Sequence, residues 1–257
     1  MAVAQAPHYA ADRPVALGQG LGRYLAMPAF LAAVLVALYL YVRFRELDSI
    51  EAESLNASFI VDSVLRHLFL VGVSTCFVIV LAVPLGILLT RPFARFVSPP
   101  IVTVANTGQA IPSFGVIVML ALGFGLGVLY AIIALVIYAF LPVLRNTMVG
   151  LRQVDPALIE AGRGMGMTKL SVLAHIELPL AVPVVLAGVR MALVVNMGTA
   201  TVAAYTAAGG LGEIIVRGLV LGRPVVKVTG AALTAVLALA VDYVAGIAED
   251  VLRPRGL

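Results

Sequence analysis

The sequence predicts an all-α, polytopic membrane protein with about six transmembrane helices. Three observations predict it: 62% of the 257 residues are hydrophobic, only 12% are charged, and the charges lie between long apolar stretches. Soluble domains carry about 45–50% apolar and about 25% charged residues, so this chain has too little charge to cover a surface in water. The arrangement is typical of helices that each cross a bilayer.

A helix needs about 20 apolar residues to cross the hydrocarbon core, so uncharged stretches locate the spans. Residues 24–42 and 67–90 each fit one helix, and 96–144 fits two helices joined near 123–127. Two further spans are predicted at 180–205, interrupted by Arg190, and at 228–248, interrupted by Asp242. We therefore divide the chain into an N-terminal tail (1–23), a first helix with an outer loop (24–60), a transmembrane core (61–248) and a C-terminal tail (249–257).

The basic residues predict the orientation of these spans. With an even number of spans, both termini lie on the same side of the membrane. That side carries ten basic residues, namely Arg13, Arg23, Arg91, Arg95, Arg145, Arg152, Arg163, Lys169, Arg253 and Arg255. The other side carries six, namely Arg43, Arg45, Arg66, Arg217, Arg223 and Lys227. The positive-inside rule places the richer side in the cytoplasm. Both termini and the segment 145–179 are therefore expected to be cytoplasmic. Charges dispersed between spans also argue against nucleic-acid binding.

The segment 145–179 is longer than a simple connection requires. Asp155 followed by Pro156 is a start signal for a helix, which the glycines at 162, 164 and 166 are expected to stop. Thr168 can cap a second short helix that ends at Pro179. A helix, a bend and a helix at a membrane surface either form a docking element for another protein or pack only against their own bundle.

The same segment resembles the EAA loop of permease subunits in binding-protein-dependent ABC importers. That loop reads Glu-Ala-Ala, three residues, Gly, nine residues, Ile, one residue, Leu-Pro, and its positions correspond here to Glu160, Ala161, Gly162, Gly166, Ile176, Leu178 and Pro179. Gly162 departs from the usual Ala. The stretches NTGQAIPS (106–113), LRNTMVGLRQVDP (144–156) and AGGLGEIIVRGL (208–219) resemble the osmoprotectant branch, which carries glycine betaine, choline or carnitine. GGLG also occurs in methionine and sulfonate importers, so those cargoes stay open.

The resemblance implies a type I ABC importer permease fold, described as MetI-like, and a set of partners. Two copies of an ATP-binding subunit would dock on the loop, with Asp155 and the loop residues named above forming the contact. A second permease chain, identical or paralogous, an extracytoplasmic substrate-binding protein and the bilayer of the bacterial cell membrane complete the expected surroundings. ATP and Mg would be bound by the partner, because this sequence contains no Gly-x-x-x-x-Gly-Lys-Ser/Thr loop. We thus expect a non-catalytic subunit that binds no cofactor and, lacking paired His or Cys ligands, no metal.

Polar residues inside spans are candidates for the translocation path, because they are costly in lipid. Two groups stand out, Asn106, Gln109 and Ser113 on one expected helical face, and Asn196, Thr199 and Thr201 around a glycine. Hydrogen bonding between helices is the alternative role. Arg190 and Asp242 are expected to form an intramembrane ion pair, either as a structural lock or as part of an inner gate. An ion-coupled secondary transporter is the remaining, remote alternative; it would be built from repeats that we do not find.

Overall fold

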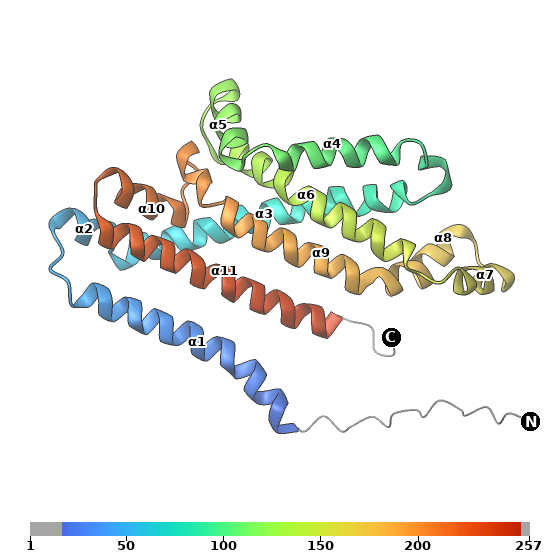
Figure 1. Ribbon diagram of the computed structural model, residues 1–257, viewed down its shortest axis with the longest axis horizontal. Helices are drawn as coiled ribbons and strands as arrows, with labels where there is room; N and C mark the ends of the chain where they lie inside the picture. The colour runs from blue at the N-terminus through green and yellow to red at the C-terminus, as the bar shows by residue number, and fades with distance from the viewer. Residues whose placement is uncertain (1–16, 253–257) are drawn as a thin grey trace, which may run out of the picture.

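The computed structural model describes the backbone of residues 17–252 and the side chains of residues 24–252. Over that part of the chain every regular element is helical (Figure 1). Five helices are long and apolar enough to cross a membrane, and a sixth span arises if the bent pair α4–α5 is counted as one. The predicted fold class is therefore confirmed. Of the expected tails, residues 1–16 and 253–257 lie outside the described residues, whereas 17–23 and 249–252 belong to long helices rather than to tails.

The first half of the chain contains two long helices and one broken one. α1 (Leu17–Arg43) leads through the short α2 (Ser49–Ser54) into α3 (Ala57–Leu89), and a 3-10 turn (η1, Pro92–Ala94) leads into α4 (Ser98–Ala110). α5 (Ser113–Phe124) follows at 92° to α4. α3 starts ten residues before the predicted span, and the added turns contain Asp62 and Arg66. With 33 residues the helix is about 50 Å long, which is longer than the hydrocarbon core requires.

The second half contains three long helices and the elements between them. α6 (Val128–Arg152) leads into α7 (Pro156–Gly164) and α8 (Lys169–Val172), and a π-helical turn (η2, Leu173–Glu177) joins α8 to α9 (Leu178–Thr199). A 3-10 turn (η3, Val202–Thr206), α10 (Leu211–Val220) and α11 (Pro224–Leu252) complete the described chain. The predicted joint near 123–127 is present, since Gly125 and Gly127 both adopt positive φ.

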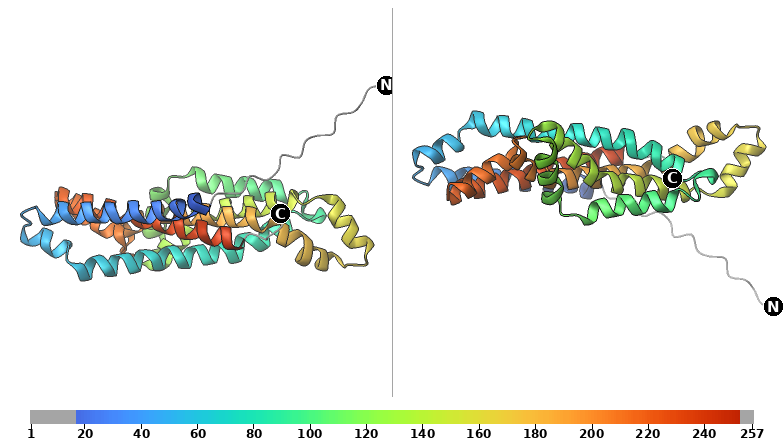
Figure 2. Two further views of the ribbon diagram at one scale, coloured as in Figure 1. Left: turned by 90° about the horizontal axis from the view of Figure 1, so that it is seen from below. Right: turned by 90° about the horizontal axis from the view of Figure 1, so that it is seen from above.

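α3, α6 and α9 form the centre of the bundle, with α11 beside α9 and α1 along α11 (Figure 2). The buried core follows the same helices, with one cluster around Val78, Ala139 and Leu144 and another around Leu70, Leu135 and Met197. α7 and α8 project at one end of the bundle, whereas α2 and α10 lie at the other and α5 stands across the side of the bundle between them (Figure 1). The segment from α7 to η2 thus projects beyond the bundle at its tip, while η2 stays joined to α9 and to the end of α3.

Candidate functional site

The projecting segment begins with the helix that the sequence predicts. Asp155 caps α7, because its carboxylate accepts a hydrogen bond from the amide of Ala157 at 2.8 Å, and Pro156 occupies the first turn. The helix continues through Gly162 to Gly164, and Gly166 then reverses the chain with a φ of +87°. A side chain at that φ would be strained, so Gly166 fixes the bend.

The second helix differs from the expected one at its end. Thr168 caps α8, where its hydroxyl accepts a hydrogen bond from the amide of Ser171 at 3.2 Å. The helix does not stop at Pro179, because η2 carries the chain without a break into α9. Within η2 the amide of Leu178 bonds to the carbonyl of Leu173, five residues earlier. Pro179 then lies in the first turn of α9, where a missing amide hydrogen is tolerated.

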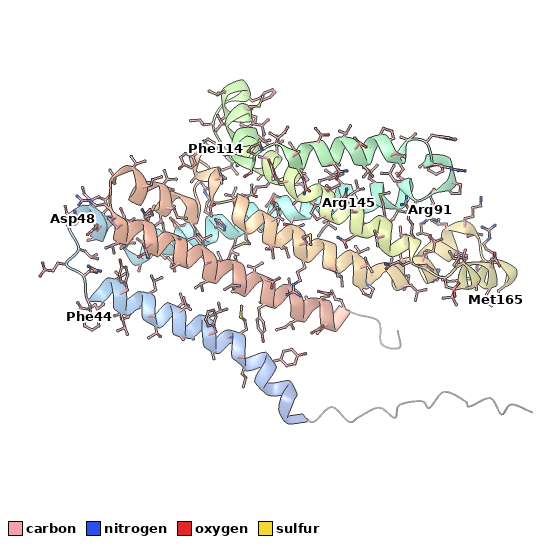
Figure 3. All side chains as sticks on the ribbon, in the orientation of Figure 1. Phe44, Asp48, Arg91, Phe114, Arg145 and Met165 are labelled. Carbon is pink, nitrogen blue, oxygen red and sulfur yellow. The ribbon has the colours of Figure 1, made fainter. Side chains whose placement is uncertain are left out.

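The EAA-like residues divide into an outward and an inward group. Glu160, Ala161 and Gly166 are exposed, and they lie among exposed apolar side chains, of which Leu158 is 47%, Met165 77% and Leu170 73% exposed. Ile176, Leu178 and Pro179 are only partly exposed and lie where the segment joins α9. The tip labelled at Met165 in Figure 3 thus offers exposed apolar side chains among exposed charges, with Glu160 flanked by Arg163 and Lys169.

Gly162 belongs to the inward group. It is buried, and a Cβ at this position would lie 2.6 Å from Cδ1 of Ile176 and 3.3 Å from Sδ of Met167. The glycine therefore lets α7 approach η2 closely. Its departure from the family's usual Ala has a structural reason within the segment.

Arg91 and Glu177 anchor the segment to the bundle, a contact that the sequence reasoning missed. Nη2 of Arg91 donates to Oε2 of Glu177 at 2.5 Å and Nη1 donates to Oε1 at 3.2 Å, while Nε donates to the carbonyl of Ile87 at 3.2 Å. Glu177 is only 6% exposed. A two-pronged, largely desolvated pair fixes both side chains in orientation. Glu177 lies inside the EAA-like motif, and that position was the available signal.

Arg190 and Asp242 lie against each other in the structure. Nε of Arg190 donates to Oδ1 of Asp242 at 2.6 Å and Nη2 donates to Oδ2 at 2.8 Å, and Glu249 lies 3.5 Å from Nη1. This contact joins α9 to α11. The nearby cavity also contains Tyr24 of α1, so three helices meet at the pair.

The polar residues around the α4–α5 break are held by α6. Arg145 donates to Oδ1 of Asn106 at 2.7 Å, and the amide of Gln109 donates to the carbonyl of Tyr138 at 2.7 Å. The hydroxyl of Tyr138 in turn donates to the carbonyl of Ile111 at the break. Ser113 starts α5 beyond the 92° bend. The expectation that Asn106, Gln109 and Ser113 share one helical face is therefore wrong, because Pro112 forces the preceding residue into an extended conformation.

The second polar group contacts α3 instead. Asn196 is fully buried, and its amide donates to the hydroxyls of Ser74 at 3.0 Å and Thr75 at 3.1 Å. Thr199 is 9% exposed, and the hydroxyl of Thr201 donates to the carbonyl of Gly198 at 2.7 Å. The contacts of Asn196 are those of hydrogen bonding between helices, the alternative role.

Comparison with known proteins identifies a family, two similar permeases and a solved structure. The family described as "Binding-protein-dependent transport system inner membrane component" matches residues 82–255. The carnitine transport permease protein OpuCB of Listeria monocytogenes is 43% identical over 194 residues, which cover 75% of this chain and 87% of that protein. The glycine betaine/carnitine/choline transport system permease protein OpuCD of Bacillus subtilis is 38% identical over 202 residues, covering 78% of this chain and 87% of that protein.

The comparison with a solved structure concerns the fold. A chain of the MetNI methionine ABC transporter in an inward-facing conformation superposes with a TM-score of 0.69, at 24% identity, covering 76% of this chain and 97% of that chain. The predicted MetI-like fold is thereby confirmed.

Proposed function

The chain belongs to the family of binding-protein-dependent transport system inner membrane components, and from this premise we propose that it moves an osmoprotectant or quaternary amine into the cell as the permease subunit of an ATP-driven importer. The observation that carries the proposal is the projecting segment 155–179, whose motif and exposed apolar tip fit a docking element. The cargo class rests on relatives whose names specify carnitine, glycine betaine and choline.

In this proposal an ATP-binding subunit docks on α7. Leu158, Met165 and Leu170 supply apolar contact area, and Glu160 supplies a charge at the rim of the contact. Burial of such side chains is worth about 1.5–3 kcal/mol each, so a few of them suffice to hold a partner. ATP and Mg are bound and hydrolysed on that partner, and this chain acts as the non-catalytic transmembrane part.

Force is passed inward through two connections. The Arg91–Glu177 pair joins the segment to the end of α3, and η2 continues directly into α9. Closure of two ATP-binding subunits on two permease chains, identical or paralogous, would thus tilt α3 and α9 between inward-open and outward-open states. An extracytoplasmic binding protein delivers the solute at the end that contains α2 and α10. The path is proposed to run past Asn106 and Gln109 at the α4–α5 break.

A single reconstitution tests the cargo and the energy source. Proteoliposomes are prepared with this chain and its ATP-binding subunit, with the binding protein outside. They are expected to accumulate radiolabelled glycine betaine, carnitine or choline only when ATP is enclosed in the lumen, on the cytoplasmic side of the transporter. An ionophore that collapses ion gradients should leave uptake unchanged. Uptake that persists without the ATP-binding subunit and disappears with the ionophore would identify an ion-coupled transporter instead.

Docking is tested by charge insertion at the tip. Met165→Glu is expected to reduce the co-purified ATP-binding subunit at least tenfold, because it places a carboxylate in an apolar contact. Phe44→Glu is the matched control, since Phe44 is 82% exposed at the opposite end of the bundle (Figure 3). Equal co-purification of both variants would overturn the assignment of this surface.

A further inference from the structure

A cavity of about 590 Å³ lies at the end of the bundle opposite the projecting segment 155–179. Its walls come from the first three turns of α3, the loop 207–210 and the start of α10, with Phe59, Asp62, Arg66, Phe69 and Glu213 as the charged and aromatic members. Cavities of about 300–1,000 Å³ are the usual size of small-molecule sites. The residues assigned to docking and to the path lie elsewhere.

Two exposed, opposite charges of this cavity are not paired with each other or with any other described side chain. Asp62 and Arg66 are one helical turn apart on α3, where side chains are about 5–6 Å apart. Within residues 24–252, neither makes a salt bridge or a side-chain hydrogen bond. Glu213, in contrast, is paired with Arg217 at 2.9 Å. A small molecule that has both a positive and a negative group could satisfy Asp62 and Arg66 together.

The remaining wall suits a cation without hydrogen-bond donors. The rings of Phe59 and Phe69 border the cavity, and the side chain of Phe69 is 50% exposed. The guanidinium of Arg217 already lies 4.2 Å from the centre of the Phe59 ring, so Phe69 is the ring that is open to a further cation. Quaternary ammonium groups bind aromatic faces in this way. Ser63, only 4% exposed, adds a hydroxyl to the lining.

The loop on the other side is shaped to leave this space open. Gly209 and Gly210 have φ values of +79° and +86°, and a Cβ at Gly209 would lie 3.1 Å from Cγ of Arg66. A Cβ at Gly210 would lie 3.1 Å from Nδ1 of the buried His67. The two glycines therefore allow the loop to approach α3 while the aliphatic stem of Arg66 lies against it.

We propose that this cavity binds a zwitterion that has a quaternary ammonium group and a carboxylate, with Asp62 and Phe69 around the cation and Arg66 on the carboxylate. The inference rests on the proposed function, and it narrows the cargo from quaternary amines in general to betaine-type molecules. A guanidinium binds a carboxylate in two-pronged fashion, and choline has no group to place there. The cavity would receive the solute from the binding protein before it enters the bundle.

The test measures solute binding in the absence of the binding protein. The complex of this chain with its ATP-binding subunit is placed in lipid nanodiscs, and equilibrium dialysis gives its affinity for radiolabelled glycine betaine, carnitine and choline. Arg66→Gln is expected to weaken binding of glycine betaine and carnitine about tenfold and to change choline binding less than about twofold. Asp62→Asn should weaken binding of all three, and Arg66→Lys should retain part of the zwitterion affinity.

The matched control is Arg45→Gln, an exposed arginine at the same end of the bundle that does not border this cavity. It should leave every affinity unchanged. Co-elution of the ATP-binding subunit confirms that each variant is folded and assembled. An equal loss of choline and betaine binding in Arg66→Gln, or zwitterion binding that is the same in Arg66→Gln and Arg45→Gln, overturns the inference.

Failure of this inference is distinguishable from failure of the proposed function. If the complete importer accumulates quaternary amines while the nanodisc complex binds none, the cavity assignment is wrong and the proposed function stands. If the complete importer accumulates none of the three solutes, the cargo itself is wrong.

Discussion

Individual glycines set how closely the central helices pack. A Cβ at Gly86 on α3 would lie 2.8 Å from Thr147 on α6, and one at Gly188 on α9 would lie 2.6 Å from Cβ of Asn146. Gly150 on α6 is similarly close to the carbonyl of Ala181, at 3.1 Å. Without a hydrophobic drive between helices in lipid, close contact of this kind is a main source of association. The three-helix centre therefore depends on residues that have no side chain.

Gly212 provides a sharp test of this dependence. A Cβ there would overlap the carbonyl oxygen of Thr201, a backbone atom that cannot turn away. We expect Gly212→Ala to destabilise the protein by about 1–3 kcal/mol through overpacking, measured as a lower midpoint of thermal unfolding in detergent. Gly72→Ala is the control, because nothing lies within 4 Å of a Cβ at that helical position. It should raise the midpoint or leave it unchanged, and equal effects of the two changes would contradict the argument.

Gly162 shows what a sequence can and cannot reveal at this scale. Its lower helix propensity, about 1 kcal/mol relative to Ala, is readable from the sequence alone and suggests a weakened docking helix. Its close approach to Ile176, fourteen positions away in η2, cannot be read from the sequence. The same holds for Asn196, whose polar character indicated either role, whereas its partners Ser74 and Thr75 come from another helix.

Among the elements, the projecting segment 155–179 is tied to the end of α3 by the Arg91–Glu177 ion pair. Arg91→Glu and Glu177→Arg are each expected to reduce transport more than tenfold, because each leaves like charges facing at a site where Glu177 is 6% exposed. The double exchange should restore a substantial part of transport. The informative readout is the number of solute molecules moved per ATP hydrolysed, since a merely structural pair would change assembly and leave this ratio intact.

The Arg190–Asp242 pair joins α9 to α11, and it is also tested by single substitutions and a charge exchange. A charge at the centre of a membrane helix costs about 2.5–3.5 kcal/mol, so loss of either partner should reduce transport and expression. The exchange Arg190→Asp with Asp242→Arg is expected to recover both. Glu249, 3.5 Å from Arg190, will oppose full recovery, because it would face an aspartate in the exchanged protein. Single losses that the exchange leaves wholly unrepaired would count against a pairing role.

Two prolines explain why element boundaries were only partly predictable. Pro112 and Pro179 both follow apolar residues in apolar stretches, and each was a reasonable place for a break. Before Pro112 the chain is extended, with ψ of 133° at Ile111, and α4 ends. Before Pro179 the π-helical bonding of η2 shifts the register, so the helix continues. Both residues precede a proline, yet Ile111 is extended and Leu178 is helical, so the proline in the sequence does not by itself reveal which outcome occurs.

For the whole molecule, charge and apolar length predicted the fold class and the number of spans. The end with α7 and α8 contains Arg91, Arg95, Arg152, Arg163 and Lys169 among the described residues, in agreement with the predicted grouping. Arg145, which was predicted to belong to the same group, lies farther along α6, where it bonds to Asn106 (Figure 3). Contacts between distant segments, such as Arg91 with Glu177, depend on the three-dimensional arrangement. A single sequence has no direct signal for them.

Cysteine labelling tests the orientation of the whole bundle. In a Cys76→Ser background, Phe44→Cys should react with a membrane-impermeant maleimide on intact cells, because Phe44 is 82% exposed at the end expected outside. Phe96→Cys, 86% exposed at the other end, should react only after the membrane is opened. The reverse labelling pattern would invert the topology and the direction of every proposed partner contact.

The right angle between α4 and α5 has a consequence for what surrounds the chain in a cell. Hydrocarbon cannot solvate peptide groups, so an interrupted helix survives at membrane depth only beside protein or water. Ile111 at the interruption is 43% exposed, and of its neighbours Ala110 and Pro112 are exposed as well. The hydroxyl of Tyr138 satisfies the carbonyl of Ile111, but a solitary copy with this corner at membrane depth would leave the neighbouring backbone facing oil. We therefore expect a sibling subunit or a wetted channel to cover the corner in the assembled importer.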